Sequence, residues 1–190
     1  MNVVKQIGLG LALTALLGNA YADTFFEAGV GYFVSSTVTD NNSASGDATT
    51  DISATELNIN YGYLQNDKYE YALFVDTIIS GTGENSDATS DYEAKDSTIG
   101  LQFAYHMNDK MKAWFGYALQ RSLSLSESSE TGLTIKGDGY LFGYAYKVGS
   151  FNLNVEYRVY SYDSGEYGGT DLDNVDYTEE TIAVGVSYPF

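Results

Sequence analysis

The chain has 190 residues, a formal net charge of −17 and no cysteine. Without cysteine it has neither a disulfide framework nor thiolate chemistry, and its acidic balance excludes nucleic acid as a partner because little positive charge is available to neutralise phosphates. Tyrosine and phenylalanine are abundant, with 18 and 9 copies, so the positions of their rings in the sequence are informative about the fold.

The first 22 residues have the pattern of a secretory signal peptide. Lys5 supplies the positive charge, residues 7–17 form an apolar core, and Ala20-Tyr21-Ala22 is a small-x-small cleavage site. The apolar run is shorter than the roughly 18 residues that span a bilayer, which argues against a membrane-anchoring helix. We therefore predict a signal peptide over residues 1–22 and one domain over residues 23–190.

Eight segments of that domain alternate apolar residues with small or polar ones. A period of two predicts β-strands, because successive side chains of a strand point to opposite faces. The strands are expected at residues 24–34, 54–64, 69–79, 97–107, 112–123, 140–148, 151–160 and 181–190. Long polar loops are expected at 35–52, 80–96, 124–137 and 161–178, and short turns at 65–68, 108–110 and 149–150.

This alternation of long and short connections is typical of outer-membrane barrels, which have long external loops and short periplasmic turns. Apart from Arg121, next to a predicted loop, the apolar faces of the eight segments contain no charged residue, as a lipid-facing surface requires. No stretch of residues 23–190 is apolar enough for a transmembrane helix, and a closed barrel is then the structure that satisfies the backbone in a bilayer. The predicted fold is all-β, an eight-stranded antiparallel up-and-down transmembrane β-barrel.

A soluble barrel with the apolar face turned inward is the alternative. It would have to pack the ring-rich faces of all eight strands inside and cover its outside with glycine, alanine, asparagine and serine. The interior of an eight-stranded barrel is only just wide enough for ordinary side chains to fill. The sequence therefore favours rings on the outside and small residues on the inside.

The inward faces carry several charges, and buried charges need partners. They are Glu27, Glu56, Glu70, Asp76 and Glu156 against Lys112, Lys147 and Arg158. Our hypothesis is that Arg158 is the centre of a polar network with Glu156 and Glu27 that seals the lumen; a switchable gate of a narrow ion pore is the alternative. Arg121 falls on the outward face near a loop, where we expect it to reach lipid headgroups.

Little in the sequence favours an enzyme or a cofactor. His106 is the only histidine, and it is expected beside a short turn, away from the long loops. A Ser–His pair needs mutual reach, and the loops contain no histidine. We predict a non-enzymatic protein without a cofactor.

The predicted long loops hold most of the carboxylates. This charge suits a solvated surface, and it also suits adhesion to a basic or cation-bridged surface. Asp171, Asp173 and Asp176 are weak candidates for binding a divalent cation such as Ca²⁺, which prefers oxygen ligands. Their spacing matches no defined calcium loop, and no other metal site is predicted.

The last strand carries the most specific pattern. Gly185, Tyr188 and the terminal Phe190 resemble the C-terminal signature of bacterial outer-membrane barrels, which in that family is read by the barrel-assembly machinery. With the signal peptide and the eight strands, the chain resembles the small barrels of the OmpX/Ail type and the barrel domain of OmpA.

The resemblance implies a place in the outer membrane of a Gram-negative bacterium, among its lipids and lipopolysaccharide. It also implies a monomer with a structural or surface-contact (adhesion-type) role. The alternative is a narrow, porin-like channel for ions or small solutes.

Overall fold

The computed structural model describes residues 22–42, 48–85, 91–126 and 132–190. The regular structure in these ranges consists of strands, in the order β1 (Ala22–Asp40), β2 (Ala48–Gln65), β3 (Tyr69–Asn85), β4 (Asp91–Asn108), β5 (Met111–Ser126), β6 (Gly132–Val148), β7 (Phe151–Tyr167), β8 (Thr170–Asp171) and β9 (Tyr177–Pro189). No helix in this part of the chain is long and apolar enough to cross a membrane.

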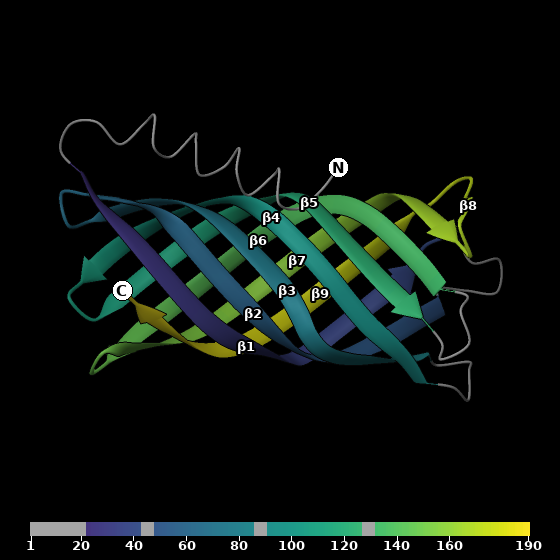
Figure 1. Ribbon diagram of the computed structural model, residues 1–190, viewed down its shortest axis with the longest axis horizontal. Coiled ribbons are helices and arrows are strands. Elements are labelled where there is room, and N and C mark those ends of the chain that lie inside the picture. The colour runs from purple at the N-terminus through teal and green to yellow at the C-terminus, as the bar shows by residue number, and fades with distance from the viewer. Residues whose placement is uncertain (1–21, 43–47, 86–90, 127–131) are drawn as a thin grey trace.

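The strands form one closed antiparallel barrel with up-and-down order, which confirms the predicted fold. Each long strand pairs with its neighbours in the chain, and β9 pairs with both β7 and β1 to close the cylinder. The two-residue β8 pairs only with the last residues of β7 and is not part of the barrel wall. Figure 1 shows the tilted strands, with the start of β1 and the C-terminus at one end and β8 at the other.

Short turns connect the strands at the end that holds the C-terminus, as predicted. Asn66 and Asp67 have φ angles of 54° and 55°, and Gly149 has a φ of 62°. These left-handed conformations suit asparagine, aspartate and glycine, whose local sterics or hydrogen bonding tolerate positive φ.

The predicted long loops are wrong over most of their length. Pairing continues through them: Thr37 lies opposite Asp51, Thr82 opposite Glu93, and Thr134 opposite Glu166. Their serine and threonine residues suggested loops, but a strand whose outer face meets water has the same polar composition. The barrel is therefore much longer than the eight predicted segments.

Four β-bulges interrupt the ladder about half-way along the barrel, one on each of β1, β3, β5 and β7. The extra residues are Val34, Ile79, Leu119 and Asp163. A bulge places two residues opposite one, so the side chains beyond it exchange faces. This exchange divides the barrel into a lower tier, toward the short turns, and an upper tier.

The two tiers have opposite polarity. In the lower tier the large apolar side chains point outward and remain exposed, among them Val30, Leu101, Phe142 and Val155. In the upper tier the apolar side chains point inward, and Leu123 and Ile135 are both 0% exposed. The buried apolar cluster contains Phe33, Val38, Ile52, Ala54, Phe74, Ile78, Ala94, Ala118, Leu123, Leu125, Ile135, Leu141, Tyr160, Tyr162 and Ala183. The upper tier therefore has the polarity of a soluble barrel.

Candidate functional site

The interior of the barrel holds three groups of ion pairs, each centred on one cation. We call them the lower layer (Lys112 with Glu27, Glu70 and His106), the middle layer (Arg158 with Glu56, Glu156 and Asp76) and the upper layer (Arg121 with Asp96, Glu179 and Tyr162).

The lower layer lies near the short turns. Lys112 Nζ donates to Glu27 Oε2 at 2.6 Å and to Glu70 Oε2 at 3.1 Å. His106 Nε2 lies 2.5 Å from Glu70 Oε1, and Asn152 and Ser187 donate to Glu27. Glu27 is therefore bound to Lys112, and not to Arg158 as we expected. The alternation along β1 correctly placed Glu27 inside the barrel, but alternation cannot specify which cation Glu27 contacts.

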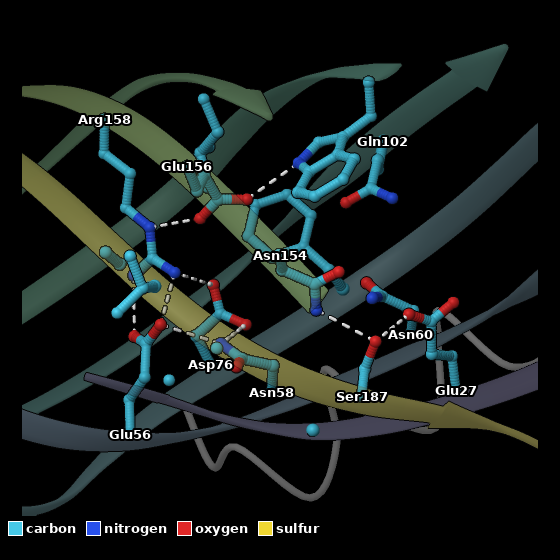
Figure 2. A pocket seen from close by; sticks show the side chains of 18 of the residues that line it. Glu27, Glu56, Asn58, Asn60, Asp76, Gln102, Asn154, Glu156, Arg158 and Ser187 are labelled. Atoms are coloured by element: carbon cyan, nitrogen blue, oxygen red, sulfur yellow. Dashed lines mark hydrogen bonds and ion pairs between the residues drawn. The ribbon is translucent and has the colours of Figure 1, made fainter. Parts of the chain in front are cut away.

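The middle layer contains the predicted Arg158–Glu156 pair together with two partners from across the lumen. The Arg158 guanidinium binds both carboxylate oxygens of Glu56, with Nη1 2.6 Å from Oε2, and its Nε donates to Glu156. Asp76 Oδ2 lies 4.0 Å from Nη2. Figure 2 shows these carboxylates converging on the guanidinium from different strands. Such fork-to-fork pairing fixes geometry as well as charge.

Two neutral side chains hold the carboxylates of the middle layer in place. Asn58 Nδ2 donates to Glu56 Oε1 at 2.9 Å and to Asp76 Oδ1 at 3.1 Å. Trp114 Nε1 donates to Glu156 Oε2 at 2.7 Å. The indole lies against Gly143, where an added Cβ would approach it to 2.0 Å. Glycine at position 143 therefore makes room for the ring inside the lumen.

The upper layer corrects the prediction for Arg121. Its side chain is 0% exposed and points into the barrel, because the Leu119 bulge moves it from the outward to the inward face. Nη2 and Nε donate to the two oxygens of Glu179 at 2.7 and 2.9 Å, and Nη1 donates to Asp96. The guanidinium also lies 4.3 Å from the centre of the Tyr160 ring. Sequence reasoning missed this layer because it assumed unbroken alternation.

The three layers leave an excess of negative charge in the lumen. They contain seven carboxylates (Glu27, Glu56, Glu70, Asp76, Asp96, Glu156 and Glu179) and the three cations Lys112, Arg121 and Arg158. A cavity of about 50 Å³ lies between the lower and middle layers, lined by side chains such as Asn58, Asn60, Gln102 and Asn154. It has room for a few water molecules, so it is a pocket inside a filled barrel.

Comparison with known proteins identifies the architecture. No family model matches the sequence, and no curated protein sequence matches it. Many solved structures match its fold, and two of them serve for comparison. One is Ail, the attachment invasion locus protein of Yersinia pestis, in complex with the heparin analogue sucrose octasulfate, with a TM-score of 0.54 and 14% identity. The other is Neisserial surface protein A, with a TM-score of 0.54 and 17% identity. Each comparison covers 90% of this chain and 100% of the other. The chain has the fold of the small outer-membrane β-barrels.

The barrel places the C-terminal signature on the ring-rich surface at the short-turn end. The Tyr188 and Phe190 rings are 4.8 Å apart, and Phe190 also lies 5.4 Å from Phe26. Gly185 packs so closely against β1 that an added Cβ would lie 2.7 Å from the carbonyl oxygen of Val30. The three residues thus lie at the contact between β9 and β1. Their recognition by the barrel-assembly machinery stays a prediction.

The barrel carries Asp171, Asp173 and Asp176 at its opposite end, where all three are exposed. Asp176 Oδ1 accepts a hydrogen bond from Asn41 at 3.0 Å. Within the described ranges, no three or more histidine, cysteine, aspartate or glutamate side chains are grouped to hold a metal ion. The structure therefore adds nothing to the weak cation-binding hypothesis for these aspartates. Residues 1–21 of the predicted signal peptide lie outside the described residues, and its last residue, Ala22, begins β1.

Proposed function

We propose that this barrel resides in the bacterial outer membrane as a closed, non-enzymatic protein whose upper tier makes contacts at the cell surface. The observation that carries the proposal is the reversal of polarity between the tiers. The outward face of the lower tier consists of rings and aliphatic side chains without a charge, and a lysine or arginine near the bilayer midplane would cost about 2–4 kcal/mol. At the upper boundary, Tyr117 donates a hydrogen bond to Asp138 at 2.9 Å, as an interfacial tyrosine would.

The surface that projects beyond this band is strongly acidic. We call its exposed carboxylates the acidic collar: Asp51, Glu84, Glu93, Asp138, Asp163, Asp171, Asp173, Asp176 and Glu180. In the described part of this tier, Lys95 and Lys136 are the exposed cations, and Lys95 is paired with Glu93 at 2.9 Å. Ail binds an anionic heparin analogue, whereas this collar would repel one. The proposed partners are cationic surfaces, or anionic ones bridged by divalent cations.

The same proposal states which molecules the barrel contacts. Its lower tier contacts outer-membrane lipids and lipopolysaccharide, and the barrel-assembly machinery recognises its last strand. A monomer suffices, because closure by β1 and β9 leaves no unpaired strand edge to recruit a second copy.

The attachment of whole cells tests the role of the collar. Cells that display the wild-type chain should adhere to a polycation-coated surface better than cells without it. Changing Asp171, Asp173 and Asp176 to Asn should reduce this adhesion by about threefold or more, and added salt should weaken the wild-type effect by screening exposed charges. The matched control changes Asp23, Asp67 and Asp109 to Asn, which removes the same charge from the short-turn end. Equal adhesion of both triple variants, at equal surface display, would contradict the proposal.

A narrow cation channel is the second candidate, and the excess of carboxylates in the lumen favours it. Against it stands the packing above the middle layer: Arg121 is 0% exposed, and the inward-facing Leu123 and Ile135 are also 0% exposed. An ion would have to break the Arg121 pairs and then cross apolar side chains.

Planar-bilayer recordings distinguish the two candidates. We expect no conductance steps above leak for the purified wild-type barrel. The Arg158→Ala variant should also be silent, because it opens the middle layer while the upper layer and the apolar cluster still block the lumen. Regular steps in the wild type would establish the channel, and steps confined to Arg158→Ala would show that the upper tier does not seal the barrel.

A further inference from the structure

The mouth of the upper tier contains a hollow that the proposed surface role does not use. Its volume is about 340 Å³, and its lining consists of Thr50 and Asn85 together with three tyrosines and three leucines: Tyr92, Tyr167, Tyr177, Leu125, Leu133 and Leu172. These residues come from β2, β3, β4, β5, β6, β7, β9 and the segment after β8. Because nearly every strand contributes, the hollow lies within the barrel opening and not on its outer wall. We call it the mouth hollow.

The floor of the mouth hollow is solid. Leu125 belongs to the buried apolar cluster, and Tyr92, Leu133 and Tyr177 pack against it. Ligand sites in proteins usually have volumes of about 300–1,000 Å³ and mainly apolar walls with a few polar groups. The mouth hollow meets this description, and it ends blindly above the upper layer. It is therefore suited to holding a ligand and not to passing one through.

Part of the apolar lining is open to solvent. Tyr167 is 54% exposed and Leu172 is 36% exposed, and the backbone NH of Leu172 is fixed by a 2.9 Å hydrogen bond to the carbonyl of Gly165. An exposed ring beside an exposed leucine, both held at the mouth, offers apolar contact area to a bound molecule.

The charge around the mouth hollow is negative. Tyr92 is followed by Glu93, Tyr167 is preceded by Glu166, and Leu172 lies between Asp171 and Asp173. Asp40 interacts with the Tyr177 phenol, and burial together with this carboxylate raises the pKa of Tyr177. Four of these carboxylates directly adjoin a lining residue in the chain, and consecutive Cα atoms are about 3.8 Å apart, so salt screens their charge only partly at the hollow.

We propose that the mouth hollow binds small organic cations with an apolar body, such as arylalkylammonium ions. The aromatic faces attract a cation through their quadrupole, the leucines cover the apolar body, and the surrounding carboxylates favour positive over neutral or negative ligands. This binding site goes beyond the proposed surface contact, because it selects a small molecule and does not need attachment to a second surface.

Three probes of the same shape and different charge test the proposal: 1-naphthylmethylammonium, 1-naphthalenemethanol and 1-naphthoate. Their binding is measured by equilibrium dialysis against the full barrel in phosphatidylcholine nanodiscs, with empty nanodiscs subtracted. The ammonium probe should bind about tenfold or more tightly than naphthoate, with the alcohol in between. Equal binding of the three probes, or no binding beyond that of empty nanodiscs, would overturn the proposal.

Substitutions then locate the bound probe. Tyr167→Ala should weaken binding of the ammonium probe about fivefold or more, since it removes an exposed ring from the lining without emptying the buried cluster. Tyr140→Ala is the matched control, because Tyr140 is 51% exposed on the outside of the lower tier, and it should leave binding unchanged. Equal losses for Tyr167→Ala and Tyr140→Ala would place the probe in the lipid and reject the mouth hollow.

Discussion

Replacing Arg121 with methionine should destabilise the folded barrel by about 3–5 kcal/mol, which is typical of breaking a buried ion pair from one side. The guanidinium meets Glu179 through two hydrogen bonds and also binds Asp96, and all three side chains are 0% exposed. Methionine keeps an unbranched side chain but is shorter and supplies no donor, so Asp96 and Glu179 would remain in the lumen without their cation. Denaturant titration of barrels in lipid vesicles measures the change, with Trp114 as the sole tryptophan signal.

A neutralised upper layer separates the charge effect from simple loss of packing. Adding Asp96→Asn and Glu179→Gln to Arg121→Met removes the unpaired charges, and the triple variant should recover more than half of the lost free energy of unfolding. Lys136→Met, at an exposed lysine, should change it by no more than about 0.5 kcal/mol. A triple variant as unstable as Arg121→Met alone would show that the arginine acts through packing and not through its charge.

The upper layer also explains why the lumen can change from polar to apolar. Below it, hydrogen-bonded charges and amides share the interior with Phe74, Leu141 and Trp114, and above it leucine, isoleucine and aromatic rings fill the interior. Arg121 suits this boundary because its guanidinium binds carboxylates at its edge while its face lies on the Tyr160 ring. Breaking this layer should therefore weaken both tiers at once.

The eight strands and the closed barrel could be predicted because the lower tier obeys a simple rule. In residues 151–159, every second residue is a ring or an aliphatic side chain, and the residues between are polar. An apolar outer face and a narrow, polar lumen impose this alternation on the lower tier. The short turns could also be predicted, because asparagine, aspartate and glycine, found here at Asn66, Asp67 and Gly149, tolerate the left-handed conformations that tight turns need.

The upper tier could not be predicted by the same rule, because its polarity is reversed. A signal was present in residues 121–126, where Leu123 and Leu125 alternate with serines and share the parity of Arg121. Interpreting this stretch as a strand with solvent outside would have placed Arg121 inside. The bulge at Leu119 hides the signal, since leucine is equally common in a regular strand.

The partners within the layers depend on geometry that one strand cannot specify. Glu156 and Arg158 are two apart on β7, so their meeting followed from the sequence. Glu56 reaches Arg158 from β2, across the lumen. Whether two such residues lie at the same level along the barrel axis depends on the shear of the strands around the barrel. The same shear directs Glu27 to Lys112, so parity alone gave the inward charges of the lower and middle layers and only part of their pairing.

Deleting Leu119 together with Gln120 should abolish folding of the barrel. Ala118 faces the lumen and would be followed directly by Arg121, so alternation along β5 would place Arg121 on the outer face and exchange the faces of every side chain beyond it. Asp96 and Glu179 would lose their cation, and Leu123 and Leu125 would leave the buried cluster at about 1.5–3 kcal/mol each. Proteins have a net stability of only about 5–15 kcal/mol, so these losses together should leave little folded protein. Heat-modifiable migration on gels, which distinguishes folded from unfolded barrels, measures the outcome.

Deleting Leu119 alone is the matched control. Leu119 is the bulge residue and is 54% exposed on the outer surface, and its removal leaves Gln120 between the inward-facing Ala118 and Arg121. The faces beyond the bulge therefore stay as they are, and this variant should fold to nearly the wild-type extent. If both deletions fold equally well, then the ladder of β5 can absorb the missing residues elsewhere, and the number of residues at the bulge does not set the polarity of the upper tier. If both fail, the bulge itself is required. Only the contrast between the two variants shows that the number of residues between Ala118 and Arg121 decides which side chains enter the lumen.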